Sequence, residues 1–199
     1  MPVLRPEELT DRETYFLLTS IVVPRPIAWV GTTSSSGVHN IAPHSYFNII
    51  SSAPPIVHFT SSGTKDSLTN IRATGEFTIS IVDRTLLQAM NTTAVNAPPD
   101  VSEFDHVTVT KQMAQTVDAP YVAESPAVME CNVRSILSMG NGTMVFGDVG
   151  RFVIDDRVWT DAGRIDMQKL DPVGRLSGSN YTMSDTILKI PRPSWEDLR

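Results

Sequence analysis

Small polar residues and a lysine follow one another just before a predicted helix. The segment reads Phe59-Thr-Ser-Ser-Gly-Thr-Lys-Asp-Ser67. Small residues let backbone N–H groups approach an anion, hydroxyls donate hydrogen bonds, and Lys65 adds charge at the positive end of the helix. This chemistry suits a phosphate, although the spacing of Gly63 and Lys65 differs from the GxxxxGK[ST] loop of nucleotide hydrolases. A solvated turn with a helix cap explains the same residues.

A second candidate segment is Asn40-Ile-Ala-Pro-His-Ser-Tyr-Phe47, in which small and polar residues alternate with apolar ones. Pro43 has no N–H for a strand ladder, so we expect regular strand pairing to be interrupted there. An interrupted strand leaves backbone groups free to bond a planar heteroaromatic ligand. A bulge filled by local packing accounts for the segment equally well.

The third candidate is Arg175-Leu-Ser-Gly-Ser-Asn-Tyr181, which places a cation, a flexible turn and an aromatic hydroxyl within seven residues. A surface turn anchored by Tyr181 is the simpler interpretation of this pattern.

Other kinds of site are excluded or disfavoured. The four histidines lack an H-E-x-x-H motif and there is one cysteine, so no metal site is expected. No G-x-S-x-G elbow occurs, and no G-x-G-x-x-G motif follows a strand, which excludes a Rossmann domain. The net charge of −6 argues against nucleic-acid binding. With no secretory signal and no apolar stretch long enough for a membrane, a cytoplasmic protein is expected.

The elements that must position these segments are mostly short strands. Apolar or alternating runs predict strands at 27–32, 55–59, 76–82, 107–110 and 158–160. The dipeptide Asn141-Gly142 lies between two long alternating segments, 127–139 and 143–154, and predicts a hairpin.

Few helices are expected. One is predicted over 66–74, ending at Gly75, and another over 84–95 with Asp83 as its N-cap, while a short helix is expected before Tyr15. No repeat and no long linker is present, so the whole chain, 1–199, is expected to form one domain with its core at about 20–185. The pattern favours an antiparallel barrel or sandwich decorated by a few helices.

In this order, the segments resemble the flavin reductase-like family of FMN-binding split-barrel proteins. The resemblance extends from about Pro24 to Tyr181. Its markers here include Arg25-Pro-Ile-Ala-Trp-Val30, the Asn40 to Phe47 segment, Lys65-Asp-Ser with Asn70, and the Arg175 to Tyr181 segment. It implies a mainly β fold, a Greek-key antiparallel split β-barrel with a few short helices.

The resemblance also implies which residues hold FMN. Asn40, Ala42 and Ser45 would line the isoalloxazine ring. The phosphate would be held by Thr60, Ser61, Ser62 and Lys65, with Asn70 assisting. Arg175 and Tyr181 would close the site. Ser177 stands where the family commonly has glycine, so this last loop is expected to follow a different path.

The activity implied is that of an FMN-dependent NAD(P)H:flavin oxidoreductase, in which hydride passes from NAD(P)H to bound flavin and on to an acceptor. The acceptor would be free flavin, a monooxygenase partner, ferric iron or another compound, and the protein would be a homodimer. Such chemistry requires no acid–base residue of the protein. An FMN-binding electron carrier without pyridine-nucleotide activity, and an interaction module that has lost its cofactor, are the alternatives.

Overall fold

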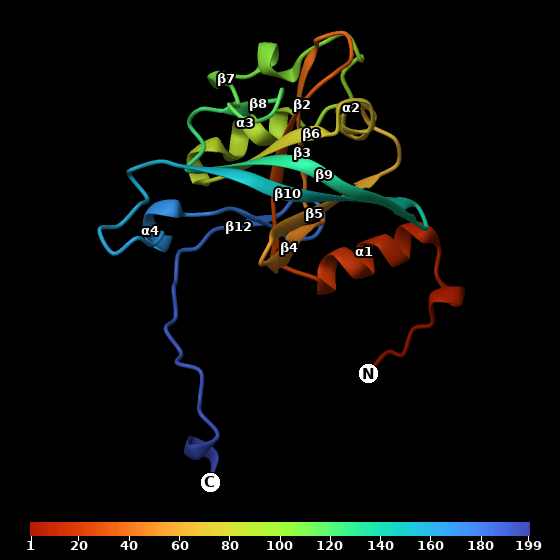
Figure 1. Ribbon diagram of the computed structural model, residues 1–199. Helices are drawn as coiled ribbons and strands as arrows, with labels where there is room; N and C mark the ends of the chain where they lie inside the picture. The colour runs from red at the N-terminus through yellow and green to blue at the C-terminus, as the bar shows by residue number, and fades with distance from the viewer.

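A seven-stranded antiparallel sheet forms the body of the computed structural model, which describes residues 1–199 (Figure 1). The order across the sheet is β3-β2-β6-β9-β10-β5-β4. The strands are Ala28–Thr33 (β2), His39–His44 (β3), Phe47–Ser52 (β4), Pro55–Ser62 (β5), Glu76–Ile81 (β6), Ala127–Met139 (β9) and Gly142–Ile154 (β10). The mainly β, antiparallel architecture that the sequence predicts is therefore confirmed.

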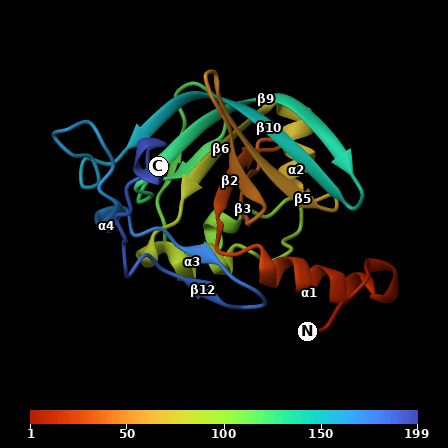
Figure 2. The same cartoon turned by 90° about the horizontal axis from the view of Figure 1, so that it is seen from below.

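The two edges of the sheet are brought together by a short connection. β3 and β4 are the edge strands, yet only Ser45 and Tyr46 separate them in sequence. The Thr60 N–H on β5 donates to the carbonyl oxygen of Tyr46 across 2.8 Å. The chain thus passes directly from one edge to the other, and the sheet curves into a split barrel (Figure 2).

Local signals explain the best-predicted elements. β9 and β10 are the two arms of the predicted hairpin, and Gly140 at its turn has a φ of +57°. The helix α2 (Asp66–Thr74) has the predicted bounds and ends at Gly75, whose φ of +74° is the left-handed conformation that glycine favours. α2 closes one end of the barrel by packing Leu68 and Ile71, each 1% exposed, into the core.

Other helices differ from the predictions. α1 (Asp11–Ile21) includes Tyr15 instead of preceding it, because Thr10 and Glu13 form a capping box at its start. The helix predicted over 84–95 is shorter: a 3₁₀ turn, Arg84–Leu86, leads into α3 (Leu87–Thr92). Thr93 ends it, and its Oγ1 accepts a hydrogen bond from Nε1 of the buried Trp29 across 2.8 Å. The remaining helix is α4 (Met167–Leu170), with 3₁₀ turns at Pro6–Glu8, Glu103–His106 and Glu196–Leu198.

Three strand predictions need correction. Residues 107–110 form no strand, and the nearby strand β7 (Lys111–Met113) pairs with β8 (Pro120–Val122). Residues 158–160 contribute only an isolated bridge between Trp159 and Ile165. The expected interruption at Pro43 is also wrong, because β3 pairs with β2 in continuous register through that residue. β3 is an edge strand, where a missing N–H is tolerated.

A small separate sheet completes the site region. It has the order β1-β11-β12, from Arg25–Pro26 (β1), Gly174–Arg175 (β11) and Tyr181–Thr182 (β12). The Val173 N–H donates to the carbonyl oxygen of Val82 across 2.9 Å and fixes β11 at the end of β6. The C-terminal segment then runs away from the body (Figure 1). No helix of the chain has the length and apolar character needed to cross a membrane.

Candidate functional site

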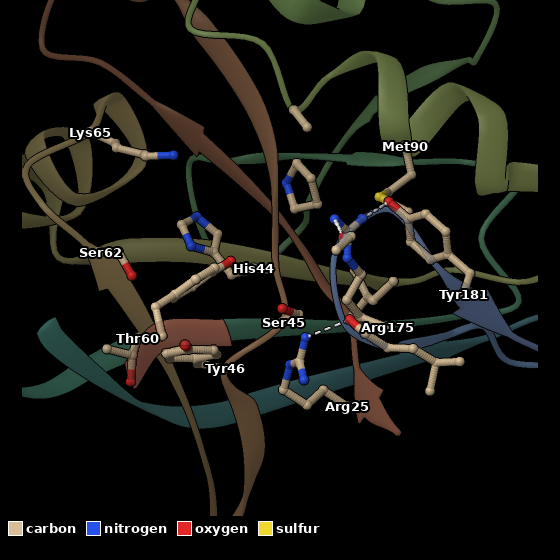
Figure 3. A pocket seen from close by; sticks show the side chains of 16 residues that line it. Arg25, His44, Ser45, Tyr46, Thr60, Ser62, Lys65, Met90, Arg175 and Tyr181 are labelled. Carbon is tan, nitrogen blue, oxygen red and sulfur yellow. Dashed lines mark hydrogen bonds between the residues drawn. The ribbon is translucent and has the colours of Figure 1, made fainter. Parts of the chain in front are cut away.

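Two adjoining cavities lie beside the edge strand β3. Cavity A, about 330 Å³, is bounded by β1, β3, β5, α3 and the β11–β12 loop (Figure 3). Its lining includes Tyr15, Arg25, His44, Ser45, Tyr46, Thr60, Ser62, Lys65, Met90, Arg175 and Tyr181. Cavity B, about 470 Å³, is lined by Asn40, Ala42, Thr64, Asp66, Ser67, Glu103 and residues 93–97 among others. Pro43, His44, Ser62, Lys65 and Ala94 line both cavities.

One end of the site is built on the start of α2. β5 ends at Ser62, and Gly63, with a φ of +76°, turns the chain toward the helix. Lys65 is the N-cap residue and makes no side-chain cap, so the N–H groups of the first turn receive no such partner. Ser62, Thr64 and Lys65 all line cavity B. This end can therefore bind an anion through backbone N–H groups, hydroxyls and an ammonium group.

The β3 side of the site rests on a buried polar network. The Asn40 Nδ2 donates to both carboxylate oxygens of Glu103 across 2.9 Å, and its Oδ1 accepts from the Ser67 Oγ across 3.1 Å. The Asn70 Nδ2 donates to the Thr32 Oγ1 across 3.0 Å. Glu103 is only 3% exposed, and burial raises the pKa of its carboxyl group. The network fixes the orientation of the Asn40 amide and ties β3 to α2.

The opposite end of cavity A carries two arginines. Arg25 on β1 and Arg175 on β11 are cross-strand partners in the small sheet. The Arg25 Nη1 donates to the carbonyl oxygens of Thr19 and Val22, each across 2.7 Å, and its Nη2 donates to that of Leu176 across 2.9 Å. Arg25 therefore joins the end of α1 to the β11–β12 loop.

Tyr181 holds Arg175 over the cavity. The Arg175 guanidinium donates to the Tyr181 hydroxyl and to the carbonyl oxygen of Gly178, and it lies 4.5 Å from the centroid of the Tyr181 ring. The Tyr181 hydroxyl in turn donates to the Asn91 Oδ1 on α3 across 2.9 Å. Figure 3 shows Arg175 and Tyr181 on the far side of the cavity from Ser62 and Lys65.

The electrostatic character of cavity A is positive. Arg25, Lys65 and Arg175 line it, and no Asp or Glu does. None of the three forms an ion pair with a carboxylate of the chain. His44 adds no charge at neutral pH, because burial and the nearby Lys65 lower its pKa to about 4. The cavity is therefore suited to an anionic or electron-rich ligand.

Comparison with known proteins identifies the family of this chain. Residues 20–163 match the flavin reductase like domain. The chain belongs to the flavin reductase-like family. Nitrilotriacetate monooxygenase component B from Bacillus cereus is 32% identical with a TM-score of 0.91, over 96% of this chain and 98% of that one.

Two further structures extend the comparison. A 2-nitrobenzoate 2-nitroreductase from Pseudomonas fluorescens is 28% identical with a TM-score of 0.91, over 98% of each chain. The flavoredoxin of Desulfovibrio vulgaris is 25% identical with a TM-score of 0.79, over 85% of this chain and 91% of that one. Membership of the flavin reductase-like family makes the protein a flavin-binding member of an oxidoreductase family.

The residues present fit a flavin that carries a phosphate. The α2 N-terminus and Lys65 offer donors and positive charge for the phosphate, and cavity A offers cations for the negative charge that the ring takes up on reduction. Two buried atoms, the Arg25 Nε and the His44 Nε2, have no hydrogen-bond partner within the chain, and both side chains line cavity A. The cavity volumes fall within the range of about 300–1,000 Å³ that is usual for ligand sites.

The structure brings together most residues that the sequence singled out. The residues that line the cavities are Asn40, Ala42, Ser45, Thr60, Ser62, Lys65, Arg175 and Tyr181. Ser61 and Asn70 do not line them: the Ser61 Oγ donates to the carbonyl oxygen of Gly63, and Asn70 belongs to the buried network. Their expected contacts with FMN remain predictions.

Several polar lining residues were absent from the sequence prediction, among them Arg25, His44, Tyr46 and Glu103. His44 and Tyr46 flank the candidate Ser45, and Arg25 begins a segment that carries the family resemblance, so these three positions gave a usable signal. Glu103 had no such signal, because it meets Asn40 across 63 residues of sequence.

Proposed function

We propose that this protein is an FMN-dependent NAD(P)H:flavin oxidoreductase. When bound, FMN would accept a hydride from NAD(P)H and pass the electrons to an acceptor. The observation that carries the proposal is the pair of adjoining cavities, with an anion-binding helix start at one end and a carboxylate-free, cationic wall at the other.

The residues divide into two groups by what they would do. Lys65, Ser62 and Thr60 would bind the phosphate, with the first-turn N–H groups of α2. Asn40, Ala42 and Ser45, at the β3 edge, would line the isoalloxazine ring, and the Glu103 carboxylate would hold the Asn40 amide in place. Positive charge near the ring would favour its reduced, anionic state, because fixed charges stabilise charge that develops beside them.

A homodimer is part of the proposal and is supported by α1. Apolar side chains on several sides of this helix are exposed, among them Tyr15 at 54%, Leu18 at 56% and Ile21 at 70%. A cluster of exposed apolar side chains of this kind is typical of an interaction surface, which favours a second copy as its cover. Because Tyr15 also lines cavity A, this cover would complete the wall of the cofactor site.

Analytical ultracentrifugation tests the dimer. A mass of twice the chain mass for the wild type, with a monomer mass for Leu18→Asp, would support it. A monomeric wild type would contradict it.

The test of the activity is optical. The purified protein should be yellow, with the visible absorption bands of oxidised flavin, and the colour should bleach when NADH or NADPH is added under anaerobic conditions. A protein that takes up no flavin after incubation with excess FMN would remove the proposal.

An FMN-binding electron carrier without pyridine-nucleotide activity is the second candidate. It is favoured by the likeness to flavoredoxin and by the lack of a compact nicotinamide-binding motif in the sequence. Anaerobic stopped-flow mixing separates the two candidates. Saturable bleaching by NADH or NADPH favours the oxidoreductase, whereas a flavin that only dithionite reduces favours the carrier.

A further inference from the structure

We infer that Arg25 and Arg175 form a second anion-binding subsite, separate from the one at Lys65. This second subsite binds the anionic group of the substrate that reacts with the flavin. That group is either the diphosphate of the hydride donor or a carboxylate on the acceptor. The inference rests on the proposed function, since it assigns the FMN phosphate to the α2 end.

The first support is the pairing of two like charges on neighbouring strands. Arg25 and Arg175 are backbone partners in the register of β1 and β11, and both side chains line cavity A. Like charges directly opposite on paired strands destabilise a sheet. No carboxylate of the chain pairs with either guanidinium, and none lines cavity A. An anion bound in cavity A would offset the repulsion between these two charges.

The second support is the incomplete hydrogen bonding of Arg25. Its side chain is more than nine-tenths buried, with the residue 7% exposed, and its Nε has no partner in the chain. The other donors are held by the carbonyl oxygens of Thr19, Val22 and Leu176, so the guanidinium is fixed in position. A buried charged donor without a partner is costly, and a ligand oxygen would satisfy it.

The third support is the separation of the arginines from the α2 end. Lys65 lines both cavities, whereas neither arginine lines cavity B, where the start of α2 lies. Figure 3 places Arg175 with Tyr181 across the cavity from Ser62 and Lys65, and Arg25 at the lower end of the view. One phosphate would therefore leave one of the two cationic ends free for another anion.

Arginine suits this role chemically. Its planar guanidinium offers paired N–H donors whose spacing matches the two oxygens of a carboxylate or phosphate group. The Tyr181 ring and the Gly178 carbonyl oxygen hold Arg175 in place before a ligand arrives. Both a diphosphate and a carboxylate present such oxygens, so the two sources must be separated by experiment.

The test uses FMN-loaded protein and compares charged with neutral probes of similar shape. For the donor, NADH is compared with N-benzyl-1,4-dihydronicotinamide, which has no phosphate, by anaerobic stopped-flow reduction. For the acceptor, binding of benzoate is compared with binding of neutral benzamide through the change in the flavin spectrum. Arg175→Gln is the main variant. Arg175→Lys, which keeps the positive charge, replaces it if the glutamine variant does not fold. The control is Arg134→Gln, which removes an arginine from the exposed Arg134–Asp148 ion pair.

In each arm the measured quantity is the ratio between the charged and the neutral probe, of reduction rates for the donor and of binding constants for the acceptor. We expect Arg175→Gln to lower this ratio by about tenfold or more in at least one arm. The loss should be smaller in Arg175→Lys and absent in Arg134→Gln. A loss confined to the donor arm identifies the diphosphate, and one confined to benzoate identifies the carboxylate. Equal effects on charged and neutral probes in both arms would overturn the inference. If FMN affinity alone falls, the arginines belong to the cofactor, which also overturns it. Failure of both dihydronicotinamides to bleach wild-type flavin would instead contradict the proposed activity, and the benzoate arm would still test the subsite.

Discussion

His44 should make the flavin-free protein lose stability in mild acid. Its ring is 7% exposed and packs against Phe59, and burial followed by the charge of Lys65 lowers its pKa from 6.5 to about 4. The unfolded chain takes up a proton near pH 6.5, whereas the folded chain does so only near pH 4. The stability that neutral His44 contributes is therefore fully present above pH 6.5 and is lost as the pH falls toward 4.

The size of the effect follows from the shift. At about 1.4 kcal/mol per pKa unit, the full shift corresponds to about 3 kcal/mol. Between pH 7 and pH 5 the expected loss is about 2 kcal/mol, because titration of the unfolded chain is nearly complete at pH 5. Urea unfolding at both pH values measures this loss in the wild type and in His44→Phe, which keeps a ring against Phe59 and has no proton to gain.

The comparison isolates His44 from the other groups that titrate in this range. The wild type should lose about 2 kcal/mol more than His44→Phe between pH 7 and pH 5. Equal losses in the two proteins, or a His44 pKa near 6.5 in an NMR titration of the folded protein, would show that burial does not keep this imidazole neutral.

Three other predictions concern binding and packing. Lys65→Ala should weaken FMN binding by about 10- to 100-fold in a fluorescence titration, through loss of a charge-assisted contact, and unchanged affinity would contradict it. Gly31→Ala should destabilise the protein by about 1–3 kcal/mol or more in urea unfolding, because a Cβ there would overlap the Pro120 carbonyl oxygen. The control is Gly150→Ala, which should have little effect because the nearest neighbours of its Cβ would lie 3.9 Å away. Glu130→Gln should cost about 1–3 kcal/mol in the same assay, because the buried carboxylate accepts backbone N–H groups of the 115–116 loop and pairs with Arg151, whose side chain is 33% exposed. Unchanged stability would count against it.

Elements with signals close together in sequence could be predicted. The bounds of α2 follow from its terminal residues and Gly75, and the β9–β10 hairpin follows from Asn141-Gly142 between alternating segments. The helix at 84–95 began as expected, since the Asp83 side chain accepts from the N–H groups of Thr85 and Leu86. Its early end was not predictable, because the partner of Thr93 is Trp29, 64 residues away.

Features that depend on distant neighbours were beyond the sequence. Pro43 signals a missing N–H, but whether that interrupts pairing depends on β3 being an edge strand. The opposition of Arg25 and Arg175 depends on strands 150 residues apart in the chain. The candidate ligands at Lys65 and Ser62 could be predicted, because hydroxyls, glycine and lysine gather beside a helix start. On the cationic wall opposite them, Arg175 could be predicted from the family resemblance, but its pairing with Arg25 could not.

A crystal structure of the protein grown with FMN shows directly whether the two cavities hold the cofactor. We expect the phosphate within hydrogen-bond distance of the Lys65 ammonium group and the first turn of α2, and the ring system against the β3 edge at Ala42 and Ser45. FMN bound in any other part of the molecule, with these cavities holding only solvent, would contradict it.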